Sequence, residues 1–302
     1  MSRLTVFMPV YNEQNYLREA IDSILSQTYE DFVFLVIDDG STDSSREILN
    51  SYNDSRMKII FNEENKGISY TRNLGLELCD TEFIAFMDAD DIAPLYRLEK
   101  EVEYLDRHLE MVGVGGYAEY IDKNGETVKN YNMLENPKYI KAHMVFENVF
   151  ANGSMMLRTK IIKENNLKYR NLSYAEDYCF HCEILQFGLM GNLRETMQFY
   201  RVVDNGLSAK ARENIDIMHN SLDFVHEMQL KLWGFELEPE KRKIFLQAFR
   251  HDGEINSEKE LKMLYLCLKD MVEQAEESQD MIKIACRKMF GRALTKCFWL
   301  WE

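Results

Sequence analysis

The sequence predicts an α/β fold in which helices cover both faces of a mostly parallel sheet, and two observations carry this prediction. First, short apolar segments of strand character alternate four times with helical segments between residues 4 and 91. Such alternation with short connections is typical of a doubly wound sheet. Second, the apolar segments are continuous, as expected for strands that are buried on both faces. From about Asn214 the strand signals end, and we expect a helical C-terminal extension.

The first four strands and the helices between them occupy the first third of the chain. We expect strands at residues 4–10, 32–37, 57–61 and 83–87. The segment after the first strand carries apolar residues at i, i+3, i+4, i+7 and i+8, which is the stripe that a helix packs against a sheet. The second helix opens with the capping-box pattern Ser44-x-x-Glu47, and the third begins at Gly67.

After Asp91 the pattern becomes less regular. Pro94 suits the first residue of a helix that we expect to reach about Leu109, because proline is favoured at that position. Asp122-Lys123-Asn124-Gly125 is typical of a hairpin turn. Further strands are expected at 112–120, 154–157 and 193–203. One further helix is expected to begin at Asn136-Pro137, and another is expected to span 176–187. We therefore expect an α/β domain at residues 1–210 and a helical region at residues 211–302.

Composition and charge restrict the class of partner. The 302 residues carry a formal net charge of -15, which opposes binding to a nucleic-acid backbone. No apolar stretch is long enough to span a bilayer, and Ser2-Arg3 leads into a strand-like segment rather than a signal peptide. We therefore expect a cytoplasmic protein with reduced cysteines. Cys179 and Cys182 have the spacing of half a zinc site, but no second pair of this kind exists, and buried thiols are the favoured alternative.

The segment Thr81–Asp91 places three carboxylates directly after a buried strand. They belong to Asp88, Asp90 and Asp91. In open α/β sheets ligands bind at the carboxyl ends of the strands, and crowded carboxylates are costly there unless a cation lies among them. Hard oxygen ligands of this kind suit Mg²⁺ or Mn²⁺ with a phosphate-bearing substrate. An acidic turn that caps a helix near Pro94 explains the same residues equally well.

Three further loops are expected at the same edge of the sheet. They comprise residues 9–13, 38–41 and 66–73. Asp39, or Asp38, can accept hydrogen bonds from a base or a ribose, although the Asp-Gly-Ser-Thr pattern also suits a turn and a helix cap. Arg72 can pair with phosphate or with the acidic cluster. Taken alone, it also fits an ordinary surface arginine.

Taken together, these motifs resemble family 2 glycosyltransferases of the GT-A fold. The resemblance is carried by the order and spacing of MPVYNEQNYLREAIDSILSQTYEDFVFLVIDDGSTDSS, NKGISYTRNLGL, FMDADD and AEDY. It is strong from Leu4 to Asp91, weaker up to Ser208 and absent beyond. It implies a nucleotide-sugar-binding half at residues 1–91 and an acceptor-binding half at residues 92–210.

The resemblance also implies roles for individual residues. Asp39 would contact the nucleobase, usually uracil, and Arg72 would lie near the diphosphate or the ribose. Asp90 would hold Mn²⁺ or Mg²⁺ on the diphosphate of a UDP-sugar, and Asp88 would contact the ribose or the sugar. The other residues implied to line the nucleotide-sugar site are Pro9, Val10, Tyr11, Glu13, Lys66, Gly67 and Ala89.

Asp177 is implied to be the general base that accepts the proton of the acceptor hydroxyl in an inverting reaction. Attack at the anomeric carbon builds negative charge on the departing diphosphate, which a metal at Asp90 would stabilise as a Lewis acid. A positioned base contributes about 10²- to 10⁴-fold in rate. From the residues alone, Glu176 and Asp177 need no more than the favourable interaction of acids with a helix N-terminus.

Several residues near these motifs have no assigned role. The family often carries a histidine after a Tyr-Arg pair, but none follows Tyr200-Arg201, and the third metal ligand is therefore unassigned; Asp204 is a weak substitute, and Ser208 follows it. His181 either tunes the base or packs as an ordinary histidine. Asn152-Gly153-Ser154 either faces the acceptor or forms an ordinary turn.

The segment Ile282–Trp301 interrupts the acidic trend of the chain. Lys288, Arg292 and Lys296 recur at i, i+4 and i+8, opposite an apolar, aromatic-rich face. This arrangement suits an anionic membrane surface. A helix docked on the protein is the favoured alternative, and a homodimer surface is a third. The resemblance implies a cytoplasmic hexosyltransferase that acts on a glycan or lipid-linked acceptor in surface polysaccharide synthesis, and the membrane alternative for this segment would place it at the inner face of the membrane.

Two other functions use the same acidic residues. A phosphoryl-transfer enzyme would use Asp88 or Asp90 as its nucleophile, but no hydroxyl residue stands two places after the second acid. A receiver-like signalling domain would use Asp38, Asp39 and Asp88 as an acidic pocket. Such domains are far shorter than this chain, and they leave Asp177 unexplained.

Overall fold

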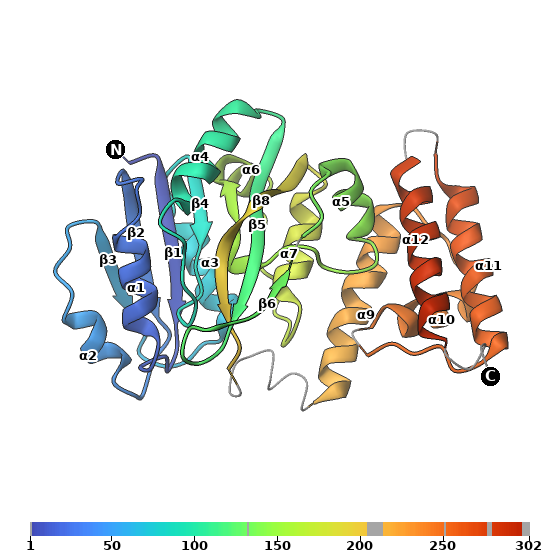
Figure 1. Cartoon of the computed structure of the whole chain (residues 1–302), viewed down its shortest axis with the longest axis horizontal. Helices are drawn as coiled ribbons and strands as arrows, with labels where there is room; N and C mark the ends of the chain where they lie inside the picture. Colours follow the sequence, from blue (N-terminus) through green and yellow to red (C-terminus); the bar gives the residue numbers. More distant parts are fainter. Residues whose placement is uncertain (1, 132, 204–213, 251, 277–279, 298–302) are drawn as a thin grey trace. The chain divides into compact units, whose positions relative to one another are not determined.

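The computed structural model describes residues 2–131, 133–203, 214–250, 252–276 and 280–297 (Figure 1). Contacts between Cα atoms divide the chain into two compact units. The first comprises residues 1–137, 150–172 and 176–209, and the second comprises residues 138–149, 173–175 and 210–302. Residues 138–149 thus belong with the helical end of the chain, which the sequence pattern does not indicate.

The first unit is built on one sheet, in which β1 lies between β2 and β4 (Figure 1). Its strands are β1 (Leu4–Val10), β2 (Phe32–Asp38), β3 (Met57–Phe61), β4 (Phe83–Phe86), β5 (Met111–Ile121), β6 (Thr127–Tyr131), β7 (Met156–Arg158) and β8 (Leu189–Arg201). Its helices are α1 (Leu17–Leu25), α2 (Ser45–Asn50), α3 (Ile68–Leu78), α4 (Arg97–Arg107), α6 (Thr159–Glu164) and α7 (Glu176–Ile184), with the short 3-10 helix η1 (Asn152–Ser154).

The strand order confirms the predicted α/β fold. The order is β3-β2-β1-β4-β7-β5-β6, and β8 also pairs with β5. The first four strands of this order are parallel to one another, and β5 and β8 are also parallel. The strands β6 and β7 are antiparallel to their neighbours. The parallel half comes from residues 4–86, where strand and helix alternate in the sequence.

Helices cover both faces of the parallel half. The residues Leu4, Val6, Met8 and Val10 of β1 share a buried apolar core with residues of α1, α2 and α4. On the opposite face of β1, Phe7 lies against α3, where a Cβ added to Gly75 would come within 2.5 Å of the Phe7 ring. Phe7 also packs edge-on against Phe86 at 6.4 Å. Burial on both faces explains why the strands read as continuous apolar runs.

Several element boundaries differ from the predictions. The helix expected from Pro94 begins only at Arg97, because Ile92 pairs with Phe199 of β8 and keeps the preceding chain out of a helix. The strand expected from residue 193 begins at Leu189, since pairing with β5 extends it through Gly191. The helix expected to reach residue 187 ends at Ile184.

The second unit is helical, which confirms the predicted C-terminal extension. It contains α5 (Pro137–His143) apart from its first residue, α9 (Ile215–Leu232), α10 (Pro239–Phe249), α11 (Glu258–Gln274) and α12 (Asp280–Lys296). The side chain of Asn214 caps α9 by accepting a hydrogen bond from Ile217 N, and the side chain of Ser257 caps α11. In the core, the ring of Phe146 lies 5.9 Å from that of Phe245 and 4.9 Å from that of Phe249.

Two of the three basic residues predicted on the C-terminal helix contact other residues of this unit. The Lys288 ammonium lies 4.3 Å from the centre of the Tyr139 ring, and Arg292 forms an ion pair with Glu147 at 2.5 Å. The apolar residues Ile282 and Met289 are buried. These contacts favour a docked helix. The last predicted apolar residue, Trp301, lies outside the described residues.

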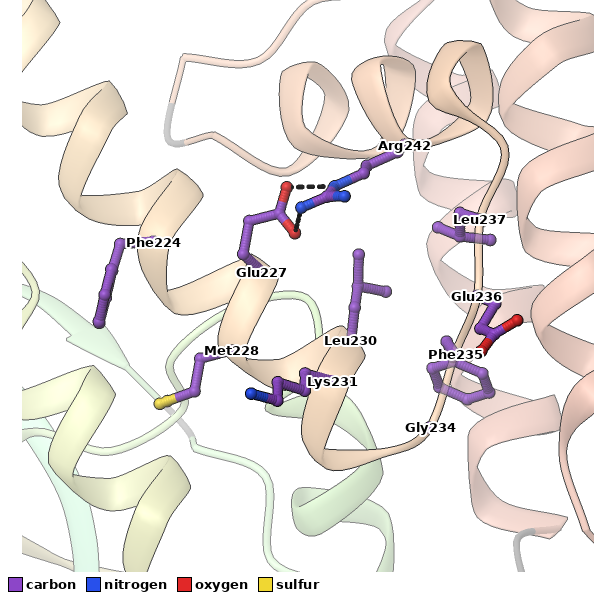
Figure 2. A pocket seen from close by; sticks show the side chains of 10 residues that line it. All are labelled: Phe224, Glu227, Met228, Leu230, Lys231, Gly234, Phe235, Glu236, Leu237 and Arg242. Carbon is purple, nitrogen blue, oxygen red and sulfur yellow. Dashed lines mark hydrogen bonds and ion pairs between the residues drawn. The ribbon is translucent and has the colours of Figure 1, made fainter.

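A cavity of about 690 Å³ lies within the second unit. It is lined by Phe224, Glu227, Met228, Leu230 and Lys231 of α9, by the loop 234–237 and by Arg242 of α10. Figure 2 shows Glu227 and Arg242 pointing toward one another, and they form an ion pair. None of the predicted site residues lines this cavity. Across the described residues, no helix has both the length and the apolar character needed to cross a membrane.

Candidate active site

The strands β1, β2 and β4 end side by side, so the loops that follow them share one edge of the sheet. Val10 pairs with Asp38, and Asp39 N donates a hydrogen bond to Val10 O at 2.8 Å. On the other side of β1, Met87 N donates to Phe7 O at 3.0 Å. The structure therefore brings the predicted loops together at the carboxyl ends of parallel strands, where open α/β sheets bind ligands.

The loop after β1 is joined to the loop after β2. Asn12, which adopts a φ of 57°, donates its backbone N–H to Ser41 Oγ at 2.9 Å and accepts from Thr42 N at 2.8 Å. Glu13 N donates to Ser45 Oγ at 2.9 Å. These bonds leave the predicted residue Tyr11 exposed at the edge of the sheet, with 42% of its surface accessible.

The two acids after β2 have different environments. Asp38 is buried and accepts hydrogen bonds from Arg46 Nε at 2.8 Å and Ser41 N at 3.2 Å. The carboxylate of Asp39 accepts from Gly67 N at 2.9 Å and from Lys66 N at 3.1 Å. Asp39 thus holds the segment that contains two other predicted residues, Lys66 and Gly67.

The residue after Asp39 must be glycine because the backbone of the segment before Lys66 lies against it. Gly40 has a φ of 75°, and a Cβ added there would lie 2.4 Å from the backbone carbonyl carbon of Glu64. Only glycine fits such a close approach in the left-handed region. The side chain of Asn62 adds a further hydrogen bond to Asp39, at 2.8 Å. Asp39 can therefore both hold the turn and accept a hydrogen bond from a ligand, because a carboxylate can accept about four hydrogen bonds.

The acidic residues after β4 separate into two groups. Asp91 is buried, accepts a hydrogen bond from Arg201 N at 2.7 Å and is bonded to the side chain of Gln198. It therefore fixes the end of β8 and does not begin the next helix. Asp88 and Asp90 are half-buried and lie toward the ligand edge. The predicted residue Ala89 between them is buried.

Electrostatics distinguishes these carboxylates from ordinary surface acids. Burial, followed by the charge of Asp88, raises the pKa of Asp90 to about 6. Burial also raises the pKa of Asp91 well above its usual value, with contributions from Asp90 and Asp88. Crowded carboxylates with raised pKa values form a donor set that suits a hard divalent cation, because the cation would offset their repulsion.

No complete metal site is formed by protein side chains alone in the described part of the chain. No three His, Cys, Asp or Glu side chains are grouped there as metal ligands. The segment in which a third ligand was expected begins with Val202 and Val203, and Asp204 and Ser208 lie outside the described residues. Cys179 and Cys182 are buried thiols outside any disulfide, and burial raises the pKa of the Cys179 thiol to about 12, which disfavours the thiolate that zinc requires.

Arg72 is buried at this edge, where it pairs with acids. Its guanidinium forms an ion pair with Glu176 and a longer contact of 3.5 Å with Asp88. It also lies 5.3 Å from the centre of the Tyr169 ring. Of the two partners that the sequence left open for Arg72, phosphate and the acidic cluster, the structure shows contact with the acidic cluster.

Asp177 lies in the first turn of α7, next to Glu176. Burial, followed by the charge of Glu176, raises the pKa of Asp177 to about 7. Tyr178 N donates a hydrogen bond to the Asp177 carboxylate at 2.7 Å. A carboxyl group with a pKa near neutrality is suited to accept a proton from a hydroxyl, because ideal proton acceptors titrate near the working pH.

His181 packs as an ordinary buried histidine. Its ring lies 5.4 Å from that of Phe150, and neither nitrogen has a hydrogen-bond partner in the described part of the chain. Burial lowers its pKa to about 3, so the ring is neutral. The structure shows no hydrogen bond between His181 and Asp177.

The structure also shows contacts of residues to which the sequence assigned no role. Arg201 is buried and donates from Nε to Asp90 O at 2.9 Å and from a terminal nitrogen to Glu19 Oε2 at 2.5 Å. Gly153 of η1 lies so close to Asp88 that an added Cβ would come within 2.9 Å of Asp88 Oδ2. No sequence signal singles out Gln198 and Arg201, because β8 also carries Asn192, Arg194, Glu195 and Thr196.

The chain is similar to known proteins in both sequence and structure. The model of the family described as "Glycosyl transferase family 2" matches residues 5–171. An uncharacterized glycosyltransferase from Haemophilus influenzae is 35% identical over 217 residues, which cover 68% of this chain and 67% of the relative. Another from Methanocaldococcus jannaschii is 35% identical over 183 residues, covering 59% of this chain and 62% of the relative.

Other similar proteins have more specific names. TuaG of Bacillus subtilis, a glycosyltransferase named for teichuronic acid biosynthesis, is 24% identical over 77% of this chain and 92% of its own length. The structure of Staphylococcus aureus TarS residues 1–349 with UDP-GlcNAc superposes with a TM-score of 0.63 and 20% identity, covering 97% of this chain and 89% of that one. The mannosyltransferase PcManGT of Pyrobaculum calidifontis, in complex with GDP-Man and Mn²⁺, gives a TM-score of 0.60 and 15% identity, covering 100% and 88%.

Proposed function

The chain belongs to glycosyltransferase family 2, and from this premise we propose that it is an inverting hexosyltransferase. The proposed donor is a nucleotide-diphosphate sugar of the UDP-sugar class, and the proposed acceptor is a glycan or lipid-linked acceptor in surface polysaccharide synthesis. UDP-GlcNAc and GDP-Man are bound by two structurally similar proteins, and TuaG is named for synthesis of a surface polymer. Family membership removes the phosphoryl-transfer and receiver-like alternatives.

One observation carries the proposal. Arg72 contacts both Asp88, after β4, and Glu176, the residue before Asp177. Residues for the donor and a base for the acceptor therefore belong to one cluster, although 89 positions of sequence separate Asp88 from Asp177. Transfer between two bound substrates needs this proximity, because it places the attacking hydroxyl beside the anomeric carbon.

On the donor side, Asp39 accepts hydrogen bonds from the nucleobase in addition to those from Lys66 and Gly67. The exposed ring of Tyr11 and the residues Pro9, Val10 and Glu13 line the nucleotide. Asp88 binds the ribose or the sugar. Asp90 would hold Mn²⁺ or Mg²⁺ beside the donor diphosphate, and such an ion would supply Lewis-acid stabilisation of the negative charge on the leaving group.

On the acceptor side, Asp177 takes the proton of the attacking hydroxyl. The bond to Tyr178 N fixes one carboxylate oxygen, which orients the group. Because the pKa of Asp177 is raised to about 7, its ionised form is a stronger base than an ordinary aspartate.

The location of the protein stays a prediction. We propose that it works in the cytoplasm, with Ile282–Trp301 near the inner face of the membrane if the acceptor is lipid-linked. The contacts of Lys288 with Tyr139 and of Arg292 with Glu147 leave less of the basic face for lipid than the sequence pattern suggested. A homodimer surface at this helix is the remaining alternative.

The donor is identified by a screen of UDP- and GDP-sugars with Mn²⁺, Mg²⁺ or EDTA. We expect at least one UDP-sugar to raise the unfolding temperature and to be hydrolysed slowly, with both effects reduced by EDTA. The expected stabilisation follows from ligand binding to the folded state, about 2.7 kcal/mol at a ligand concentration of 100 Kd. If no nucleotide sugar shifts the unfolding temperature under any metal condition, the proposed donor class is wrong.

Gly153→Ala tests the close approach of η1 to Asp88. The added Cβ would lie 2.4 Å from Gln198 Nε2 and 2.9 Å from Asp88 Oδ2, and both distances are too short to be kept, so both contacts must be relieved by a shift. We expect a stability loss of about 1–3 kcal/mol from overpacking and a fall in transfer rate of up to about 10²-fold from the displaced carboxylate. The measurements are thermal unfolding and steady-state kinetics.

The matched control is Gly291→Ala in α12, because among the described residues a Cβ added there would meet no atom within 4 Å apart from its chain neighbours and the backbone of its own helix. This variant should keep the kinetics of the wild type. If Gly153→Ala transfers sugar at the wild-type rate, the position of Asp88 relative to η1 does not matter for the reaction.

A further inference from the structure

The guanidinium of Arg72 is nearly enclosed by protein groups. The residue is 6% exposed. Its two terminal nitrogens contact the carboxylates of Glu176 and Asp88. The central carbon of the guanidinium lies 5.3 Å from the centre of the Tyr169 ring. A diphosphate that bound this guanidinium would compete with two carboxylates for it. Leaving either buried carboxylate without its partner would be costly, which favours the observed pairing.

The neighbouring residues of α3 hold the backbone that leads toward α7. Asn73 Nδ2 donates to Tyr169 O at 3.0 Å, and Tyr169 N donates to Asn73 Oδ1 at 2.8 Å. One turn earlier, Ser69 Oγ donates to Arg170 O at 2.9 Å. Three hydrogen bonds from one helix therefore fix two consecutive residues of the segment that precedes Asp177, the proposed base.

The same segment packs directly on α7. The ring of Tyr169 stacks on that of Phe180 with centres 4.1 Å apart and planes inclined by 20°. Tyr169 is therefore fixed by α3 on one side and in contact with α7 on the other. Together with the ion pair between Arg72 and Glu176, this gives α3 two independent contacts with the helix that carries Asp177.

From these contacts we propose that Arg72 is a positioning residue, which holds the base Asp177 in register with Asp88, and that it is not a ligand of the donor diphosphate. Asn73 supports the same arrangement through Tyr169. The inference rests on the proposed function, since it assigns Asp177 and Asp88 to the two substrates. Arginine suits this position because its planar fork can pair with two carboxylates at once, whereas lysine offers a single ammonium group.

The pKa of Asp177 depends on the charge of Arg72, so the pH dependence of the transfer rate can test the proposal. Asp177 interacts electrostatically with several charged or titratable groups. They are Glu176 and Cys179 on α7, Arg72 on α3, Asp88 after β4, and Tyr169. Among these, Arg72 lowers the pKa of Asp177 and the acids raise it. Removing the Arg72 charge therefore raises the pKa of Asp177 and moves the acidic limb of the transfer rate to higher pH.

The test compares Arg72→Met, Arg72→Lys and the control Arg56→Met. Arg56 is a matched control because it also pairs with a carboxylate, Asp54 at 2.8 Å, and lies over a ring, Phe32 at 4.8 Å, outside the candidate site. For Arg72→Met we expect kcat to fall by about 100-fold and its pH profile to move upward, while the Kd for UDP with Mn²⁺ changes less than about threefold. Arg72→Lys should restore the pH profile and only part of kcat, and Arg56→Met should change neither.

Two results overturn the inference. One is a loss of UDP affinity in Arg72→Met that matches the loss of kcat, as expected for a diphosphate ligand. The other is a wild-type kcat and pH profile in that variant. If Arg72→Met does not fold, Arg72→Lys and Asn73→Ala carry the same comparison, with Asn73→Ala expected to lower kcat without moving the pH profile.

Amide hydrogen exchange separates this inference from the proposed function. Peptides that cover residues 168–180 should exchange faster in Arg72→Met and Asn73→Ala than in the wild type, and peptides of β1 should not. This comparison requires no substrate. Absence of nucleotide-sugar binding by the wild-type protein would refute the proposed function, whereas unchanged exchange in both variants would refute the positioning role.

Discussion

Asp177→Asn is expected to lower the transfer rate by about 10²- to 10⁴-fold while leaving donor binding intact, because the amide cannot accept the proton of the acceptor hydroxyl. The substitution keeps the size of the side chain, and the amide oxygen can still accept the hydrogen bond from Tyr178 N. Steady-state kinetics with the donor found in the screen measures the rate, and calorimetry with UDP measures donor affinity.

Asp80→Asn is the control for the same chemical change. Asp80 forms an exposed ion pair with Lys163, away from the candidate site, and its side chain is 87% exposed. Its variant should transfer sugar at the wild-type rate. If Asp177→Asn retains that rate as well, another group accepts the proton and the assignment of Asp177 is wrong.

The pH dependence of the wild-type reaction provides a second check on Asp177. Asp177 must be ionised to accept a proton, and its pKa is raised to about 7 by burial and by Glu176. The rate of the chemical step should therefore fall about tenfold per pH unit below pH 7 and level off above it. A rate that stays constant down to pH 5 would show that the essential base titrates as an ordinary carboxyl group.

Asp90→Ala is expected to remove the effect of Mn²⁺ on UDP binding. Under the proposed function, an ion held by Asp90 would neutralise charge on the diphosphate of the wild-type complex, an effect worth several kcal/mol. Losing it should lower kcat/KM by at least about 100-fold, which corresponds to about 2.7 kcal/mol. Calorimetry of UDP with and without Mn²⁺ measures the coupling between the metal and the nucleotide.

The control for Asp90→Ala is Asp31→Ala, since Asp31 is an exposed aspartate just before β2. Metal titrations of this variant should follow those of the wild type. The metal role assigned to Asp90 is incorrect if UDP binding by the wild type does not respond to Mn²⁺, or if Asp90→Ala keeps the wild-type response.

The parallel half of the fold could be predicted from the sequence because its signals are local. The run Leu4–Val10 and the run Met57–Phe61 are strands with the predicted limits. Continuous apolar composition marks a strand buried on both faces, and the helical stripe after β1 marks the face of α1 that packs on it. Because parallel strands place their carboxyl ends at one edge, the shared location of Asp39 and Asp88 also followed from the order of the elements.

The second half was predicted less well because its elements are defined by partners far away in the sequence. Pro94 carries a valid local signal for a helix start, but the pairing of Ile92 with Phe199 delays the helix to Arg97. Gly191 carries a valid local signal for a break, but pairing with β5 continues β8 through it. In both cases a long-range backbone pairing outweighs a local preference of roughly 1 kcal/mol or less.

By itself the sequence determined the fold class, the family resemblance and the edge of the sheet at which the site lies. Only the tertiary structure decided how the charged residues of that edge are paired. Nothing in the local pattern distinguishes Asp91, which is bound to Arg201 and Gln198, from Asp88 and Asp90, which face the ligand edge. Nor does it show that Arg72 pairs with Glu176, 104 residues later. A buried charge is stable only with a partner, and such partners are brought together by the packing of α3, β4, α7 and β8 rather than by their neighbours in the chain.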